Sequence, residues 1–288
     1  MIHFTKYWAL YLIISAIVIG VGAFSILKWN YTFSIDFVGG TNIEYQLTKT
    51  LTEKSVQNIL GDQKIEVQTL NVQGSTILLR SKPLDEKQEL ALRTEMESKS
   101  AGIVKVLKYE TVGPVLGKEM MVKTFLAGGL AILGILLYMA YAFRSFQFAA
   151  AAIIALIHDF FVVLGIYSLF SHFLGAQVDT LFVTALLTAM SFSVHDTIII
   201  FDKIREYTKK GIGDHLEDKA NRALTENFVR SVNNSMTIII MLTALTILGG
   251  STIRFFAATL LIGTITGTYS SPFIATPALV LLERFRKK

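Results

Sequence analysis

The chain has 288 residues, of which 52% are hydrophobic and 17% are charged, whereas an ordinary soluble domain has about 25% charged residues. It contains no cysteine, which excludes disulfides, thiolate metal sites and cysteine nucleophiles. Its formal net charge of +5 lies mainly in segments that follow long apolar runs, and therefore indicates no nucleic-acid partner. Several of these runs are long enough to cross a bilayer, so we expect a polytopic α-helical membrane protein.

The first apolar run, residues 7–27, is predicted to be a membrane helix that the protein retains. It is too long for the apolar part of a cleavable signal peptide, and it has no clear small-residue cleavage site. We expect residues 1–29 to form the N-terminus and the first transmembrane helix.

Residues 30–118 are polar and contain an ordinary share of charged residues, and apolar and polar residues alternate in several short segments. This pattern predicts one water-soluble domain. Its elements are expected in the order βαββαβ, the pattern of an α+β ferredoxin-like domain. Thr52 and Asp85 are candidate N-caps. Gly61 is predicted to end the first helix, and residues 73–74 are predicted to form a hairpin turn. The predicted strands cover residues 37–47, 64–72, 75–80 and 103–109, and the predicted helices cover residues 52–60 and 84–100.

Five more spans are predicted in residues 119–288, which makes six transmembrane helices with the first. Lys and Arg gather in the short segments on one side of the spans, and this side is the cytoplasm by the positive-inside rule. We therefore predict a multi-pass protein of the cell membrane (plasma or inner membrane) with both termini cytoplasmic and domain 30–118 extracytoplasmic. The five spans are expected at residues 120–143, 148–170, 178–201, 229–248 and 255–282, with a charged cytoplasmic loop at 202–227.

The fourth span carries Asp196 beside His195, inside an otherwise apolar run. An ionisable side chain in a membrane is costly unless it is paired, hydrated or neutral, so this acid indicates a function. Arg230 begins the fifth span, and the hairpin between the spans brings it to a similar depth. Burial favours the neutral form of a carboxyl, and a nearby arginine favours the charged form. Our hypothesis is that Asp196 accepts a proton with Arg230 as its charge partner. The alternative is a static packing pair.

A second ionisable pair lies in the third span and is a candidate for the same polar path. The pair consists of His158 and Asp159. Each polar residue near the proton site could instead form an ordinary hydrogen bond between membrane helices, and each histidine could simply be packed; these alternatives stay open. The full set of candidates for the path is His195, His158, Asp159, Ser193, Asn233 and Asn234.

Four motifs stand in order over nearly the whole chain. They are residues 34–41 (SIDFVGGT), with Asp36, Phe37, Gly39 and Gly40; residues 112–117 (VGPVLG), with Gly113 and Pro114; residues 191–206; and residues 267–277 (GTYSSPFIATP). In sequence, spacing and span layout they resemble the SecF family, the smaller subunits of the SecD–SecF pair of the protein-export machinery. More distantly, they resemble resistance-nodulation-division transporters. Ser34 and His195 stand where the family usually has Gly and Asn.

The resemblance implies that proton flow through the membrane domain drives extracytoplasmic domains that pull a translocating polypeptide outward. It implies a SecD-like subunit as the heterodimer partner, with the Sec translocation channel, the translocating polypeptide and membrane lipid as further contacts. It implies no nucleic acid and no cofactor. Whether sodium replaces protons stays open.

Two other functional classes compete with this interpretation. One exported domain and six spans are half of the usual resistance-nodulation-division architecture, so the chain also fits a half-size transporter of small molecules or lipids. An enzyme is disfavoured, because neither Asp159 nor Asp196 has the G-x-G-D setting of an intramembrane aspartyl protease. A metal site is disfavoured, because adjacent His and Asp side chains diverge on a helix. We expect no enzymatic activity and no bound metal.

Overall fold

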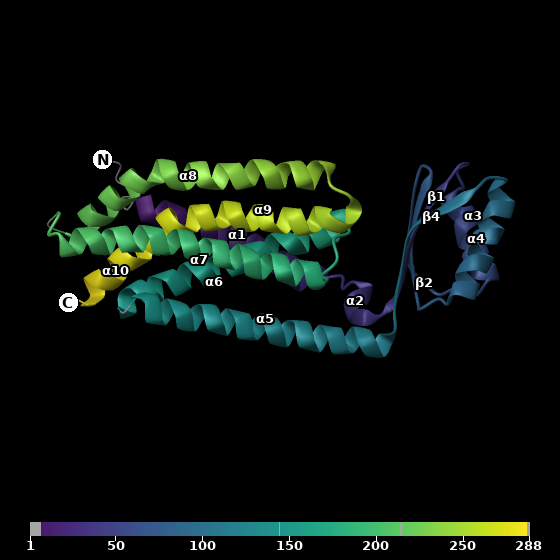
Figure 1. Cartoon of the computed structure of the whole chain (residues 1–288), viewed down its shortest axis with the longest axis horizontal. Coiled ribbons are helices and arrows are strands. Elements are labelled where there is room, and N and C mark those ends of the chain that lie inside the picture. The colour runs from purple at the N-terminus through teal and green to yellow at the C-terminus, as the bar shows by residue number, and fades with distance from the viewer. Residues whose placement is uncertain (1–6, 144, 214, 287–288) are drawn as a thin grey trace. The chain divides into compact units, whose positions relative to one another are not determined.

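The computed structural model describes residues 7–143, 145–213 and 215–286. The chain divides into two compact units (Figure 1): Phe33–Phe125, here called the sheet unit, and Met1–Thr32 with Leu126–Lys288, here called the membrane unit. These bounds lie close to the expected limits at residues 30 and 118. The placement of the sheet unit outside the cell stays a prediction.

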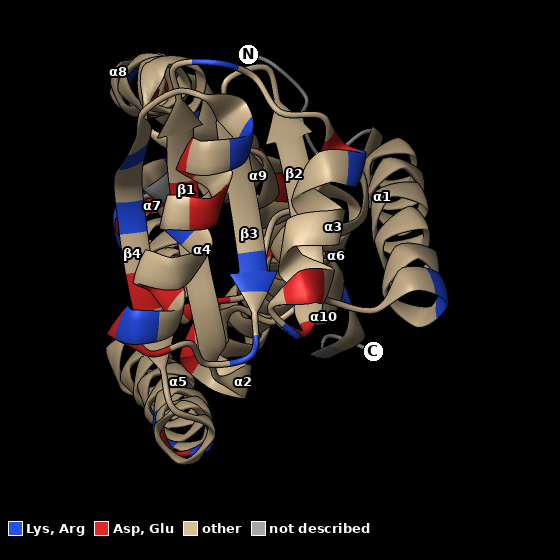
Figure 2. Cartoon of the chain, turned by 90° about the vertical axis from the view of Figure 1, so that its right-hand side faces the viewer, with Lys and Arg blue, Asp and Glu red and all other residues tan. Residues whose placement is uncertain are grey.

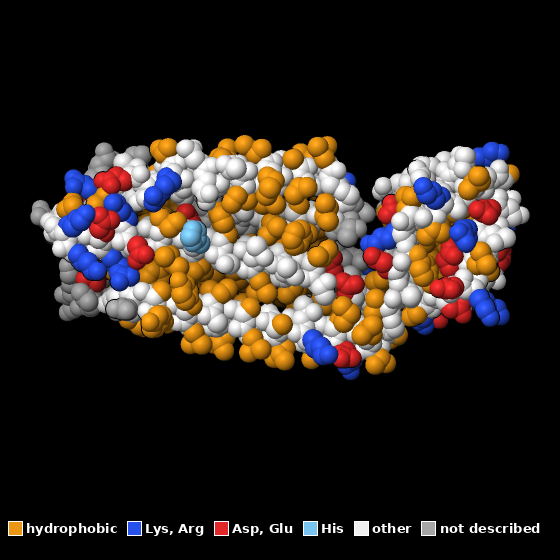
Figure 3. Space-filling model, viewed as in Figure 1, with side chains coloured by type: hydrophobic (Ala, Val, Ile, Leu, Met, Phe, Trp, Pro, Cys, Tyr) orange, Lys and Arg blue, Asp and Glu red, His pale blue; other side chains and the backbone are white. Residues whose placement is uncertain are grey.

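Within the described residues, six helical spans are long and apolar enough to cross a membrane. Hydrophobic side chains cover much of the flank of the membrane unit (Figure 3). The prediction of a polytopic α-helical membrane protein is therefore confirmed. The spans are α1 (Trp8–Trp29), α5 (Pro114–Phe143), α6 (Phe146–Leu174), α7 (Thr180–Lys209), α8 (Leu216–Leu248), and a last span made of α9 (Ser251–Ser270), the π-helical segment η2 (Ser271–Ala275) and α10 (Thr276–Arg286).

The predicted charged loop at 202–227 is wrong, because most of these residues continue α7 and α8, and residues 210–215 connect the two helices. Oppositely charged side chains stand three or four residues apart along the end of α7. Lys203 Nζ lies 3.1 Å from Glu206 Oε2, and Lys210 Nζ lies 2.6 Å from Glu206 Oε1. Such pairs stabilise a helix beyond the apolar part of a membrane, where hydropathy no longer signals it.

The membrane unit packs around α6, α7 and the last span, whose apolar segments are its most buried. α1 lies against α6 through a contact of two glycines. A Cβ atom built on Gly22 would lie 2.6 Å from the Cα atom of Gly165, far inside a normal contact. One turn further along, the hydroxyls of Ser25 and Ser168 are hydrogen-bonded at 2.9 Å. Small residues thus allow the two backbones to approach closely, as in other membrane helix pairs.

Substituting Gly22 by valine is expected to destabilise the membrane unit by about 1–3 kcal/mol, the usual cost of overfilling a packed interface. The cause is the Cβ atom, which has no room beside Gly165. Thermal unfolding of the purified protein in detergent measures the effect. The matched control is Gly20→Val on the same helix, because a Cβ atom at Gly20 meets nothing within 4 Å. Equal unfolding temperatures for the two variants would contradict the close glycine contact.

The sheet unit contains one four-stranded antiparallel sheet in the order β2-β3-β1-β4, and α3 and α4 cover one face of it (Figure 1). The element order βαββαβ is as predicted, preceded by the short helix α2. The ferredoxin-like assignment itself stays a prediction. The elements are α2 (Ile35–Val38), β1 (Gly40–Leu47), α3 (Glu53–Asp62), β2 (Val67–Gln73), β3 (Thr76–Ser81), α4 (Glu86–Ser100) and β4 (Val104–Val112).

Capping side chains begin the helices where the sequence predicts. Thr52 accepts a hydrogen bond from the backbone N–H of Ser55, and Asp85 forms a reciprocal capping box with Gln88. The apolar faces of these helices pack on the sheet, and both helices also carry acidic and basic residues (Figure 2). The fully buried core includes Ile43, Tyr45, Leu60, Leu79, Leu92 and Met96.

Several predicted boundaries in the sheet unit are wrong, among them the start of the second strand, which is Val67 rather than residue 64, and the end of the last, which is Val112 rather than residue 109. The first strand begins at Gly40 rather than at residue 37, because Ser34 caps one turn of helix over residues 35–38. The helix α3 continues past Gly61 to Asp62. The hairpin turn uses residues 74–75, since residue 73 still pairs in the sheet. Boundaries of this kind depend on caps and register more than on hydrophobic pattern.

Candidate functional site

Asp196 lies on α7 in the middle of the membrane unit and is 8% exposed. The hydroxyl of Ser231 on α8 donates a hydrogen bond to Asp196 Oδ1 at 2.7 Å. Among the residues that the structure describes, the other oxygen, Oδ2, is buried and has no hydrogen-bond partner. A buried ionised carboxylate needs several donors or a counter-charge, whereas a neutral carboxyl needs fewer. With one hydroxyl donor and one unpaired oxygen, Asp196 has fewer partners than a buried carboxylate needs.

Ser271, the first residue of η2, faces the Asp196 carboxyl from the last span. Its hydroxyl is hydrogen-bonded to Thr197 Oγ1 at 2.9 Å and donates to the backbone carbonyl of Gly267 at 3.1 Å. Neither Ser231 nor Ser271 was predicted to be a site residue. Ser271 lies in the motif at residues 267–277, and Ser231 directly follows Arg230, so these positions were the signals available.

The predicted ion pair between Asp196 and Arg230 is not formed in this structure. The Arg230 side chain is exposed, and its guanidinium donates to Asn227 Oδ1 at 2.6 Å. Ser231 is the next residue along α8, and successive side chains on a helix point about 100° apart. The rotation of α8 about its axis therefore decides whether serine or arginine faces the acid.

Asp159 on α6 is the centre of a second network, and it is 3% exposed. Its Oδ1 lies 2.8 Å from His158 Nδ1. Its Oδ2 accepts hydrogen bonds from Ser193 on α7 and from Ser270 on α9, the latter at 2.6 Å. The structure thus brings together His158, Asp159 and Ser193, which the sequence had grouped in one path. His158 Nε2 is buried without a partner among the described residues.

Three other candidates for the polar path lie outside both networks. The side chains of His195 on α7 and of Asn233 and Asn234 on α8 are exposed. The inward polar contact of this part of α8 is made instead by Ser235, whose Oγ accepts a hydrogen bond from Thr268 Oγ1 at 2.7 Å. The sequence could not distinguish these neighbours, because polar residues follow one another here without a helical period.

The two buried carboxyls belong to separate networks and share no hydrogen bond among the described residues. Within the same part of the chain, no three His, Asp or Glu side chains gather as metal ligands.

The motif before β1 is built for close backbone packing. Gly39 has a φ of 76°, and a Cβ atom there would lie 2.7 Å from the Cα atom of Pro114. Gly40 has a φ of 133°, and its Cβ atom would meet the Ser81 carbonyl oxygen at 2.7 Å. Glycine is the residue that tolerates both conditions. Phe37 is 2% exposed beside them, so the motif joins α2, β1 and the start of α5.

The remaining motif positions frame the same junction. The backbone N–H of Asp36 donates to Ser34 Oγ at 3.2 Å, which caps α2. Gly113 precedes Pro114, the first residue of α5, and a Cβ atom at Gly113 would meet nothing within 4 Å. Proline suits a first helical position because its missing N–H has no partner to lose there. These residues therefore shape the junction of α2, β1 and the start of α5.

A buried arginine, which was not identified from the sequence, stabilises this junction. Arg80 on β3 is 6% exposed, and it donates to the backbone carbonyl of Phe33 at 2.7 Å. Burial lowers the pKa of Arg80, and the nearby charge of Asp36 opposes this shift. The arginine thus ties the first residue of the sheet unit to its central strands.

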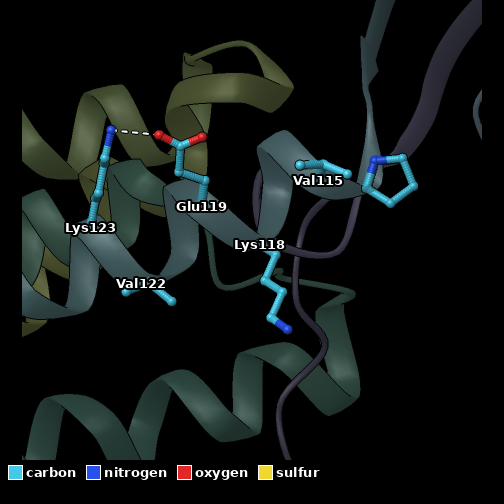
Figure 4. A pocket seen from close by; sticks show the side chains of 6 residues that line it. Val115, Lys118, Glu119, Val122 and Lys123 are labelled. Carbon is cyan, nitrogen blue, oxygen red and sulfur yellow. Dashed lines mark hydrogen bonds and ion pairs between the residues drawn. The ribbon is translucent and has the colours of Figure 1, made fainter.

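A surface hollow of about 540 Å³ lies along the first turns of α5. Figure 4 shows its side chains arranged along one helix, with an ion pair between Lys123 and Glu119 at 2.6 Å. The hollow is open and almost entirely apolar. An open, apolar hollow along one helix does not resemble a site for chemistry.

Comparisons with known proteins agree with this architecture. Residues 93–285 match the family model described as protein export membrane protein SecD/SecF, C-terminal. The chain is 38% identical to the protein translocase subunit SecF of Thermobaculum terrenum, over 98% of this chain and 94% of that protein. It is 32% identical to the protein translocase subunit SecDF of Bacillus subtilis, over 94% of this chain and 37% of that protein.

A solved structure shows the same arrangement. The crystal structure of SecDF from Thermus thermophilus, titled a translocon-associated membrane protein, matches 98% of this chain with a TM-score of 0.84 and 28% identity. The chain spans 39% of the length of that SecDF protein. The family model and the curated relatives each cover most of this sequence, and together they establish that the chain belongs to the SecD/SecF family of protein export membrane proteins, as a SecF-type translocase subunit.

Proposed function

We propose that this subunit uses proton flow through the membrane unit to drive motion of the sheet unit, which lies outside the cell and helps to pull a translocating polypeptide. The single observation that supports the proposal best is Asp196, a buried carboxyl with one hydroxyl donor and one unpaired oxygen. Such a group gains from binding a proton and, once ionised, gains from moving toward a positive charge.

Arg230 is the nearest candidate for that positive charge. It follows Asn227 by one helical turn on α8 and precedes Ser231, the present partner of Asp196. A rotation of α8 by about 100° would bring the residue before Ser231 into its place. In the proposed cycle, protonated Asp196 accepts from Ser231, and ionised Asp196 attracts Arg230. Two discrete rotations of one helix would then follow the two proton states.

A small cavity gives the proton a route. It has a volume of about 20 Å³ and is lined by Ser231, Asn227 and Thr268, among apolar side chains. A space of this size holds about one water molecule. A water there would lie beside Ser231, whose hydroxyl binds Asp196. One charge that crosses the membrane releases roughly 2.3 kcal/mol per 100 mV, enough to bias a two-state helix.

A SecD-like subunit is the proposed partner, and the Sec channel lies beyond it. The SecDF relatives are much longer than this chain, which matches 37% of one and 39% of another. Apolar side chains along α5, among them Leu126, Leu130 and Leu137, are exposed and available to partner helices or lipid. The relatives are named as protein translocase subunits, and this favours polypeptide over small molecules as the substrate.

The proposed orientation places both termini in the cytoplasm of a cell-membrane protein. Charged side chains gather at the end of the membrane unit that carries the α7–α8 connection and α10 (Figure 3). Lys203, Arg205 and Lys210 are among them. This clustering supports a cytoplasmic location for that end.

The proposal is tested in sealed membrane vesicles that contain the chain, a SecD-like subunit and the export channel. Export of a model polypeptide is compared with and without a protonophore, and with sodium or potassium as the only added cation. We expect the contribution of this chain to disappear when the proton gradient collapses, in either salt. Export that continues at the same rate after the collapse, or that follows a sodium gradient alone, would overturn proton coupling.

A further inference from the structure

Two adjacent serines connect the two acid networks. Ser270, the last residue of α9, donates to Asp159 Oδ2 at 2.6 Å. Ser271, the first residue of η2, faces Asp196 and is hydrogen-bonded to Thr197, the residue after that acid. Both serines are fully buried. The last span therefore bonds the Asp159 carboxyl through Ser270, and through the next residue it bonds Thr197, the neighbour of Asp196.

The two serine hydroxyls also share an acceptor. Ser271 Oγ donates to the carbonyl of Gly267 at 3.1 Å, and Ser270 Oγ lies 3.3 Å from the same oxygen. The backbone N–H of Ser271 donates to it as well. A carbonyl oxygen has two lone pairs, and the N–H and hydroxyl of Ser271 occupy both at Gly267, while the single hydroxyl proton of Ser270 goes to Asp159. If Ser271 turned its hydroxyl toward Asp196, one lone pair of the Gly267 carbonyl would become free. The Ser270 hydroxyl would then have a second acceptor besides Asp159.

The local backbone is suited to such a change. The helix passes from α to π geometry at Ser271, whose carbonyl accepts from the backbone N–H of Thr276 and from Thr276 Oγ1 at 3.0 Å. Pro272 has no N–H, so it cannot continue the α-helical ladder. Single π turns inside α-helices are rare and occur often at functional sites. The backbone hydrogen-bond pattern of the last span is thus irregular next to the two serines.

We propose that the Ser270–Ser271 pair links the two buried aspartates, so that the proton occupancy of Asp196 depends on the hydrogen bonding of Asp159. This inference rests on the proposed function, in which Asp196 exchanges a proton. Loss of that proton leaves Oδ2 as an acceptor, and the Ser271 hydroxyl turns to it from Gly267. The carboxyl O–H bond of Asp196 breaks when its proton passes to water, and the serine rearrangement that follows involves hydrogen bonds only. Ser270 and Ser271 are positioning residues in this scheme.

The other titratable groups around the pair come from each element packed against it. His195 lies on α7 beside Asp196, and Arg230 lies on α8. His158 on α6 is bonded to Asp159, and Tyr269 on α9 lies with its ring 6.2 Å from the His158 ring. The segment η2 contributes none. Ser270 and Ser271 differ from these groups because they are adjacent residues of one backbone, the first bonded to Asp159 and the second bonded to Thr197 beside Asp196.

The test measures protonation without transport. The whole chain is reconstituted in lipid nanodiscs, and infrared difference spectra follow the carboxyl band that is lost in Asp196→Asn as pH is varied. We expect Asp159→Asn to displace the pH midpoint of this band by at least about half a pH unit, equivalent to a roughly threefold change in proton affinity. In a Ser271→Ala background we expect the same substitution to have at most about a third of that effect, because the link is removed.

Control variants separate linkage from general damage. Ser168→Ala removes another buried hydroxyl, one that bonds Ser25 and touches neither acid, and should leave the midpoint unchanged. If Asp159→Asn does not fold, Ser270→Ala serves in its place. A midpoint unaffected by either variant, or displaced equally with and without Ser271, overturns the link and leaves the proposed function intact. A band for Asp196 that does not titrate overturns both.

Discussion

Replacing Asp196 by asparagine is expected to reduce gradient-driven export to the level of vesicles that lack this chain. Asparagine has nearly the same shape as aspartate, and its amide oxygen can still accept the hydrogen bond from Ser231. The fold should therefore survive. The side chain can no longer take up or release a proton, so proton binding can no longer switch α8 between its two rotations. Export of a model polypeptide under an imposed proton gradient measures the loss.

The matched control is Asp202→Asn on the same helix. The Asp202 side chain is 60% exposed and pairs with Arg205 at 3.2 Å, so its change removes an acid that is already solvated. We expect this variant to export at the normal rate, because exposed pairs contribute little. Normal gradient-driven export by Asp196→Asn would remove the basis of the proposed mechanism.

Substituting Asp159 by alanine is expected to destabilise the membrane unit by about 3–5 kcal/mol, the usual effect of removing one partner from a buried charged network. Asp159 accepts from Ser193 and Ser270 and is bonded to His158, so three buried groups lose their partner at once. Each orphaned group carries a desolvation cost. Unfolding of the purified protein in detergent, followed by circular dichroism, measures the change.

The comparison that decides this prediction is Asp196→Ala. Asp196 has one hydroxyl donor and one unpaired oxygen, so its removal should cost only about 1 kcal/mol, the typical net value of a single hydrogen bond. We therefore expect one acid to be important mainly for stability and the other mainly for transport. A variant Asp196→Ala that unfolds as easily as Asp159→Ala would show that both acids are structural.

Much of the architecture could be predicted without coordinates. In a membrane, the backbone N–H and C=O groups of a single long apolar run are all hydrogen-bonded within the run only in a helix. The six spans therefore follow from composition and length. In the sheet unit, caps such as Thr52 and Asp85 and the alternation of apolar residues predict the βαββαβ order. The acids at 159 and 196 are conspicuous for the same reason, since charges inside apolar runs are rare.

The partners of these acids depended on tertiary structure. Asp196 binds Ser231 rather than Arg230, and Asp159 binds Ser270, which no sequence signal linked to it. Membrane helices are apolar on nearly all sides, so their sequences carry little information about which side faces a neighbour. Successive residues point about 100° apart, and close packing at small residues such as Gly267 sets the rotation. The sequence by itself therefore determined that buried acids exist and how deep they lie, and only the packing of the helices decided what each acid touches.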